Sequence, residues 1–307
     1  MFVGQSPQSS RIKKLIREIA KTDDHVLLIG ELGTGKKHAA MEMHKRSKQK
    51  NRPFVTLNCT AAGDTLLEGD IFGEISQGEM GVERKIGILE QANKGILYLE
   101  NVQDLSDEFQ QKLLNIIKEG RFQRLGETHF TPVFLRVFAA TTHPELSETG
   151  FRPDLLSLLS SFVIQIPPLN ERKQDIPFLF THFLKIYCEE YQREIPAVPA
   201  ELFESMMEYD WRGNVSELKN AVRNLVLMSP EGTLSVEYLP FEVKRHPFES
   251  LVGKELPDAL SEVEGYLIKR ALHRFAGNQT KAAHALNVSE AALRYKMKKY
   301  GLTKKAF

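Results

Sequence analysis

Cysteine and long apolar runs are scarce in this chain, and each scarcity excludes a class of protein. Only Cys59 and Cys188 occur among 307 residues, too few for a disulfide framework or a metal-ligand spacing, which favours a reducing cytoplasm. No apolar run is long enough to span a bilayer, and no apolar segment follows a basic start as in a signal peptide. We therefore expect a cytoplasmic protein with no membrane partner. Internal repeats and low-complexity segments are also missing.

The charge is near balance overall but is unevenly distributed. Hydrophobic residues make up 42% and charged residues 26%, the net charge is +1, and the length suggests two or three domains. From residue 266 onward one acid, Glu290, stands against ten basic residues: Lys269, Arg270, Arg274, Lys281, Arg294, Lys296, Lys298, Lys299, Lys304 and Lys305. A basic module on a more acidic body favours contact with nucleic acid, and a solvated charged helix face is the alternative.

A buried-strand pattern at residues 26–29 runs directly into the loop Gly-Glu-Leu-Gly-Thr-Gly-Lys at residues 30–36. Its glycines allow successive backbone N–H groups to face an anion, and a helix opening at the lysine adds its positive end. Lys36 would reach the β- and γ-phosphates. A plain glycine-rich turn is the alternative. The residues that we assign to a nucleotide site here are Gly30, Glu31, Gly33, Thr34, Gly35, Lys36 and Lys37.

Strand-like and helical patterns alternate through the first half of the chain. Strands are predicted at residues 26–29, 54–57, 96–99 and 137–140, and helices at residues 10–20, 36–47 and 108–118. This alternation favours a parallel sheet with helices on both faces. Beyond Pro168 the strand signals stop, and helices are predicted at residues 176–191, 200–208 and 215–228. The predicted domains are an α/β nucleotide-binding subdomain (1–168), a helical lid subdomain (169–240), a linker (241–257) and an all-α helix-turn-helix domain (258–307).

The last fifty residues have the pattern of a helix-turn-helix. An apolar stripe at Leu260, Val263, Leu267, Ala271 and Phe275 predicts one helix, and shorter helices are expected at residues 280–286 and 290–300. Asn287 suits a left-handed turn between them, and Ser289 suits the N-cap of the second. An ordinary three-helix interaction bundle is the alternative. The residues that we assign to DNA contact are Thr280, Lys281, Ser289, Glu290, Ala292, Arg294, Tyr295 and Lys298.

These motifs, in this order, resemble those of the sigma-54-dependent transcriptional activators (bacterial enhancer-binding proteins), over nearly the whole chain. The matching segments begin at Val3-Gly4, the phosphate loop, Pro53, Ile71, Leu89, Pro167, Trp211 and Gly277. The resemblance implies a P-loop AAA+ parallel sheet with a helical lid, followed by a Fis-type helix-turn-helix. It further implies ATP or ADP with Mg2+, double-stranded DNA, a dimer through the C-terminal domain and an AAA+ ring. Val3 and Gly4 would border the adenine, and we expect no receiver domain ahead of them.

The chain departs from the family pattern at a surface loop. Relatives carry a Gly-Ala-Phe-Thr-Gly-Ala loop that contacts the sigma factor, whereas residues 74–82 here read Glu-Ile-Ser-Gln-Gly-Glu-Met-Gly-Val. The usual sigma-54 contact therefore does not carry over, while a contact with RNA polymerase stays open. Lys37 is a second departure, since it stands where the family has Glu and other P-loop proteins have Ser or Thr.

Further departures fall at the positions of the hydrolytic machinery. The Asp-Glu pair that ends the metal-binding strand is replaced by Glu100 and Asn101. Glu100 can still hold Mg2+, weakly and through water. Asn101 cannot accept a proton, so a general-base contribution of about 10²–10⁴-fold is expected to be lost.

The remaining hydrolytic positions are only partly retained. Thr142 stands at the family's sensor asparagine, Arg152 matches the first of two arginine fingers, Leu158 replaces the second, and Ser216 replaces the sensor arginine. An arginine finger contributes about 10³–10⁵-fold to the rate in related reactions. The sequence therefore predicts a domain that binds a nucleotide and has lost most hydrolysis.

Three functions remain open at the level of sequence. The first is a DNA-binding transcriptional regulator with a hydrolysis-impaired AAA+ domain. The second is an active sigma-54-dependent ATPase with divergent loops, and the third is an architectural DNA-binding protein. Target genes, the sensed signal, the direction of regulation and the ring size do not follow from the sequence.

Overall fold

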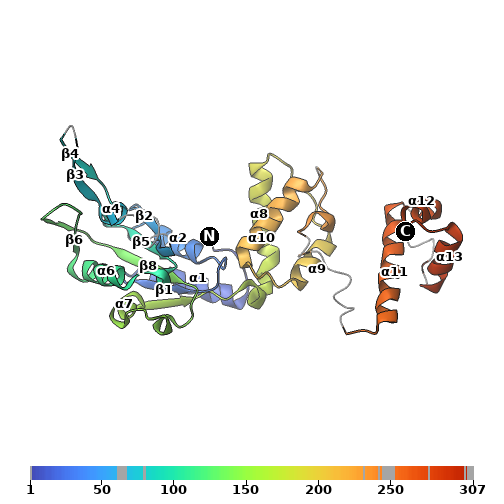
Figure 1. Cartoon of the computed structure of the whole chain (residues 1–307), viewed down its shortest axis with the longest axis horizontal. Helices are drawn as coiled ribbons and strands as arrows, with labels where there is room; N and C mark the ends of the chain where they lie inside the picture. Colours follow the sequence, from blue (N-terminus) through green and yellow to red (C-terminus); the bar gives the residue numbers. More distant parts are fainter. Residues whose placement is uncertain are drawn as a thin grey trace. The chain divides into compact units, whose positions relative to one another are not determined.

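The computed structural model describes residues 2–60, 68–78, 81–230, 232–240, 243, 253–275, 277–300 and 302. The chain divides into two compact units, Met1–Val243 and Lys244–Phe307. The first unit holds an α/β layer structure and a group of helices that follows it in the chain, and the second is all-helical (Figure 1).

A five-stranded parallel sheet forms the centre of the first unit, with strand order β2-β5-β8-β1-β9. Its strands are β1 (Val26–Ile29), β2 (Phe54–Asn58), β5 (Ile96–Glu100), β8 (Arg136–Thr141) and β9 (Phe162–Gln165). Two antiparallel hairpins extend from this body: β3 (Glu74–Gly78) with β4 (Gly81–Lys85), and β6 (Arg121–Gln123) with β7 (Phe130–Pro132). The parallel sheet that the strand–helix alternation predicts is confirmed.

Helices cover both faces of the sheet because its central strands are apolar on both sides. On one face, Val26 and Leu28 pack with apolar residues of α1 (Pro7–Ile19) and α2 (Lys36–Arg46). On the other face, Leu27 and Leu99 pack with α5 (Ile88–Gln91), α6 (Asp107–Glu119) and α7 (Pro153–Leu159). Short elements complete this layer: α4 (Glu68–Phe72), η1 (Val102–Asp104) and η2 (Leu146–Thr149).

The helical lid has a core of its own. It comprises η3 (Leu169–Asp175), α8 (Ile176–Glu190), α9 (Ala200–Glu208), α10 (Asn214–Met228) and η4 (Val236–Tyr238). Trp211 is buried at its centre, donates a hydrogen bond to the Met206 carbonyl oxygen (2.7 Å), and meets Tyr209 edge-on. The lid and the sheet belong to one compact unit.

The second unit is a three-helix arrangement of α11 (Leu256–Arg274), α12 (Gln279–Ala285) and α13 (Glu290–Lys299). Its core is built from Ile268, Ala271, Leu272, Ala282, Ala283, Leu293 and Met297. The Ser289 hydroxyl accepts a hydrogen bond from the Ala292 N–H (3.1 Å), and Asn287 has φ +53°, so the predicted N-cap and left-handed turn are confirmed. Leu260 and Leu267 of the α11 stripe stay exposed in this chain.

Candidate nucleotide site and helix-turn-helix unit

The phosphate loop connects β1 to α2, and left-handed glycines shape it. Gly33 has φ +77° and Gly35 has φ +104°, conformations that L residues rarely adopt. The Thr34 hydroxyl donates to the Glu31 carbonyl oxygen (2.8 Å) and closes the turn. A Cβ on Gly35 would meet only the Phe2 ring, at 4.0 Å, so this side of the loop is open to an approaching phosphate. The loop geometry fits a nucleotide phosphate.

Lys36 is turned inward onto the loop. Its ammonium donates to the carbonyl oxygens of Gly30 (2.6 Å) and Glu31 (2.9 Å). Burial lowers the pKa of Lys36, while the charges of Glu100 and Glu31 oppose that shift. The lysine is therefore in the loop with Glu100 near enough to act on its charge. A bound phosphate would accept the hydrogen bonds that Lys36 now donates to the two carbonyl oxygens.

The lid touches the phosphate loop directly. The Asn214 amide donates to the Leu32 carbonyl oxygen (3.0 Å) and to Glu31 Oε2 (3.1 Å), while its Oδ1 accepts from the Leu169 N–H (2.7 Å). A Cβ on Gly33 would lie 2.3 Å from the Gly213 carbonyl oxygen. The loop and the start of α10 are thus in close contact.

A second lid contact arises from η3. The Arg172 guanidinium is 2% exposed, and its Nη2 donates to the Thr34 carbonyl oxygen (2.7 Å). The Asp175 carboxylate, fully buried, accepts from the Ser6 N–H (2.7 Å), from the Ser6 hydroxyl (2.9 Å) and from the Ser9 hydroxyl (2.5 Å). One short segment therefore joins the phosphate loop to the N-terminal segment that holds Val3 and Gly4. The Cβ position of Gly4 lies 2.6 Å from the Asp175 carboxylate carbon.

Asn101 follows β5, in a left-handed conformation with φ +57°. Its amide nitrogen lies 3.3 Å from the Thr60 hydroxyl and 3.5 Å from Asn58 Oδ1, and the same hydroxyl donates to Asp104 (2.5 Å). The amide belongs to a polar cluster at the ends of β2 and β5. A carboxamide offers a neutral donor and acceptor, where a carboxylate would offer a charge.

The sensor position lies where β8 ends. Thr142 follows Thr141, whose carbonyl oxygen accepts from the Gly30 N–H (3.2 Å) and whose hydroxyl donates to Gln103 Oε1 (2.9 Å). Thr142 is thereby next to the start of the phosphate loop, and Gln103 is linked to the same strand end.

The arginine-finger region stands on α7. Arg152 forms ion pairs with Asp107 (3.5 Å) and Asp154 (3.3 Å), and the hydrogen bond to Asp154 raises its pKa. Leu158 is half-buried and packs against the core under the sheet, so the leucine has an ordinary apolar role there. Ser216 is exposed on the first turn of α10, and its N–H donates to the Gly33 carbonyl oxygen (3.3 Å).

The segment at the position of the family's sigma-factor loop contains the paired strands β3 and β4. Glu79 and Met80, between the two strands in the sequence, lie outside the described residues, as do the side chains of residues 76–83. The absence of the Phe-Thr pair is therefore established by the sequence and not by the structure.

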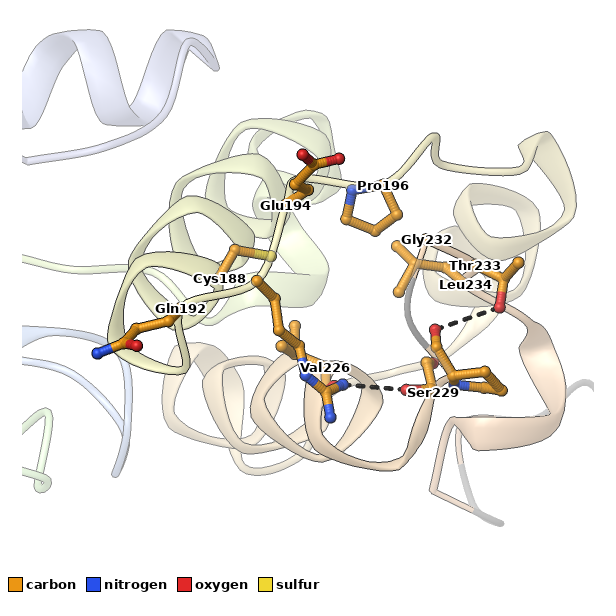
Figure 2. A pocket seen from close by; sticks show the side chains of 11 residues that line it. Cys188, Gln192, Glu194, Pro196, Val226, Ser229, Gly232, Thr233 and Leu234 are labelled. Atoms are coloured by element: carbon orange, nitrogen blue, oxygen red, sulfur yellow. Dashed lines mark hydrogen bonds between the residues drawn. The ribbon is translucent and has the colours of Figure 1, made fainter.

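A cavity of about 390 Å³ lies within the lid, away from the phosphate loop, between the ends of α8 and α10 (Figure 2). Arg193 fills part of its wall and donates to the carbonyl oxygens of Val226 and Ser229 (3.0 Å to Ser229), which caps the end of α10. Cys188, which is buried, also lines the cavity, and burial raises its pKa. These groups stabilise the lid, and the sequence-predicted site residues lie elsewhere.

Most of the predicted DNA-contact residues lie on the accessible surface of the second unit. Arg294, Tyr295 and Lys298 are exposed along α13, and Arg294 pairs with Glu290 at 3.3 Å. Thr280, Lys281 and Ser289 are exposed as well, whereas Ala292 is half-buried beside the cap. A basic helix that follows a tight turn can enter a major groove.

Sequence reasoning missed several residues that the folded site uses. Asn214, Arg172, Asp175 and Gln103 contact the loop, its flanking strand or the N-terminal segment, but each partner is far away in the chain. In the described part of the chain, no helix is long and apolar enough to cross a membrane, and no three His, Cys, Asp or Glu residues group as metal ligands.

The phosphate loop on a five-stranded parallel sheet, its helical lid and a separate helix-turn-helix unit define an AAA+ protein joined to a DNA-binding module. Residues 2–165 match the family model of the sigma-54 interaction domain, residues 170–253 that of the AAA+ ATPase lid domain, and residues 259–300 that of the bacterial regulatory proteins of the Fis family. The chain belongs to the family of sigma-54-dependent, DNA-binding transcriptional regulators.

Curated relatives match across almost the whole chain. It is 33% identical to the transcriptional regulatory protein ZraR of Salmonella typhimurium, over 96% of this chain and 68% of the relative. It is 32% identical to the C4-dicarboxylate transport regulator DctD of Rhizobium meliloti, over 99% of this chain and 65% of that protein. A signal-transduction and transcriptional-control protein of Clostridium beijerinckii is 32% identical, and the chain spans 48% of its length.

Solved structures agree with this fold. NtrX from Brucella abortus in complex with ATP superposes with a TM-score of 0.73 at 29% identity, over 98% of this chain and 70% of NtrX. Its complex with ADP gives a TM-score of 0.69 at 28% identity, over 98% of this chain and 69% of NtrX.

Proposed function

We propose that this chain is a DNA-binding transcriptional regulator whose AAA+ domain binds ATP or ADP and hydrolyses ATP poorly. The domain serves as a nucleotide-responsive or purely structural oligomerisation scaffold, and regulation proceeds without the usual sigma-54 contact loop. The observation that carries the proposal is Asn101, an amide at the end of β5 that is hydrogen-bonded to Thr60 and Asn58.

Nucleotide binding is supported by the open, left-handed Gly35 and by the placement of Lys36 within the loop. The ATP and ADP complexes of NtrX support the same ligand class. Gly30, Glu31, Gly33, Thr34, Gly35, Lys36 and Lys37 would surround the phosphates, and Val3 and Gly4 would border the base. Glu100 is the carboxylate assigned to Mg2+, as a weak ligand acting through water.

Poor hydrolysis is supported by the loss of two arginines and one amide at three further places. Leu158 packs into the core, Ser216 offers only a hydroxyl beside Gly33, and Thr142 replaces an amide. Arg152 keeps its guanidinium, but it already pairs with Asp107 and Asp154. With no general base and no second arginine, the transferring phosphoryl group receives little stabilisation.

DNA binding is assigned to α12 and α13 through Thr280, Lys281, Ser289, Glu290, Ala292, Arg294, Tyr295 and Lys298. Self-association through the exposed Leu260 and Leu267 of α11 would give a dimer, and the AAA+ domain would assemble into a ring. The altered sequence of residues 74–82 argues against a sigma-54 contact and leaves contact with RNA polymerase open.

ATP turnover by the purified chain, with and without DNA, tests the proposal. We expect phosphate release close to background under conditions in which an ATP analogue binds. Asn101→Glu alone should not restore turnover, because the second arginine and the sensor arginine are also missing. Turnover typical of an AAA+ enzyme would overturn the proposal and favour an active sigma-54-dependent ATPase. Uniform DNA coverage in footprinting, in place of discrete half-sites, would favour an architectural protein.

A further inference from the structure

The phosphate loop lacks the usual protein ligands of a magnesium ion. In P-loop proteins a Ser or Thr hydroxyl after the lysine and an Asp at the end of a neighbouring strand hold Mg2+ beside the phosphates. Here Lys37 replaces the hydroxyl, and Asn101 accompanies Glu100 at the strand end. An ammonium repels a metal cation, and the Asn101 amide carries no charge to attract one. The donor set therefore leaves Glu100 as a single weak ligand.

Lys37 is placed to do electrostatically what the metal does in other P-loops. It lies in the first turn of α2, directly after Lys36, and its side chain is exposed. It makes no hydrogen bond or ion pair with the described residues, whereas Lys36 donates to the carbonyl oxygens of Gly30 and Glu31. The residue at this position reaches the metal beside the phosphates in other P-loops, so a longer side chain here can reach the phosphates themselves.

The first turn of α2 also has an unusual balance of charge. It contains two lysines and no acid, although a helix dipole disfavours cations at its N-terminus. A bound anion removes that unfavourable interaction, because it pairs with both ammoniums and with N–H groups at the start of the helix. A metal-free triphosphate carries more negative charge than its Mg2+ complex and so suits this turn better.

We infer that this chain binds metal-free nucleoside triphosphate, with the Lys37 ammonium in place of Mg2+. The inference rests on the proposed nucleotide binding and goes beyond it, since it names the ionic form of the ligand. ATP affinity is then lower in excess Mg2+, because the metal converts the free nucleotide to a complex with less negative charge. ADP, which has less charge for Lys37 to pair with, binds more weakly.

Titration of the full chain with ATP, in excess EDTA and again in excess MgCl2, tests the inference by calorimetry. For the unaltered chain, the dissociation constant should be about tenfold smaller in EDTA than in MgCl2, because the metal removes the free nucleotide. Lys37→Thr should weaken binding in EDTA by about tenfold, the loss of one hydrogen bond to a charged group, and MgCl2 should restore part of it. Lys50→Thr is the matched control, since Lys50 is exposed beyond the other end of α2 and its change should leave both constants unaltered.

The outcomes separate this inference from the proposed function. Equal or tighter binding in MgCl2 would overturn the inference and leave nucleotide binding in place. Unchanged affinity of Lys37→Thr in EDTA would also overturn it. No ATP binding in either buffer would remove the proposed nucleotide site itself. Circular dichroism of both variants checks that the exposed substitutions leave the fold intact.

Discussion

The side-chain amide of Asn214, in the lid, donates a 3.0 Å hydrogen bond to the carbonyl oxygen of Leu32, in the phosphate loop. The same amide reaches Glu31 Oε2, and its oxygen accepts from Leu169. Asn214 adopts φ +56°, a left-handed conformation that Asn tolerates better than most residues. One buried side chain thus holds the loop, the start of η3 and the start of α10 together.

Replacing Asn214 with Asp is expected to keep one of these contacts and to break the other two. The new carboxylate keeps the bond from Leu169, but it faces Leu32 and Glu31 with oxygen in place of a donor. Unsatisfied and repelling acceptors should lower the free energy of unfolding by about 2 kcal/mol, measured by urea denaturation. Glu31→Gln in the same chain should return part of this loss. Asn220→Asp, on the exposed side of α10, is the control, and equal stability of the two Asp variants would contradict the expectation.

Gly33→Ala should show how closely the lid and the loop approach. The added Cβ would lie 2.3 Å from the Gly213 carbonyl oxygen, at a φ of +77°. Strain and overpacking together should cost about 3 kcal/mol. Gly150→Ala is a matched control, because Gly150 has φ +79° and nothing within 4 Å of its Cβ position. Its cost should be near 1 kcal/mol, typical of backbone strain alone. Thermal denaturation compares the two variants. Similar shifts in Tm would show that the lid moves away from the added methyl group at little cost.

The sequence was informative where a pattern is local. Val26–Ile29 is predicted to the residue because a central parallel strand is apolar on both faces and ends at a glycine. Strand β9 escaped prediction because it is an edge strand whose Phe162 and Val163 are partly exposed, so its pattern resembles a loop. Helix α1 starts at Pro7 with Ser6 as its cap, earlier than the predicted start at Ser10.

In the nucleotide site, too, residues close together in the chain could be predicted and distant ones could not. The phosphate loop was visible because its glycines and lysine lie within seven consecutive residues. Asn214 and Leu32 are 182 residues apart, and Arg172 lies 138 residues from Thr34. No periodicity or turn chemistry links positions at such separations. Only the folded chain brings η3 and the start of α10 onto the loop.

Ser216→Arg should strengthen nucleotide binding without changing the fold. Ser216 is exposed, and its Cβ lies 3.2 Å from the Cβ position of Gly33, so a guanidinium there can reach the phosphates. One additional charge-assisted hydrogen bond should raise ATP affinity by about tenfold. Asn220→Arg adds the same charge one turn further along α10, and its affinity should match that of the unaltered chain. Fluorescence titration with a labelled ATP analogue measures both, and equal gains would point to a general charge effect.

Arg294→Ala and Lys298→Ala should weaken DNA binding in different ways. Arg294 is held by Glu290 at 3.3 Å on the exposed side of α13, where a planar guanidinium can read a base edge. Its loss should cost about 1–3 kcal/mol on specific DNA and little on unrelated DNA. Lys298 has a compact charge suited to phosphate, so its loss should weaken both and reduce the salt slope by about one. Lys219→Ala, exposed on the lid, controls for charge alone. Fluorescence anisotropy at several salt concentrations measures these effects, and equal losses on all DNA from both variants would exclude Arg294 as a base reader.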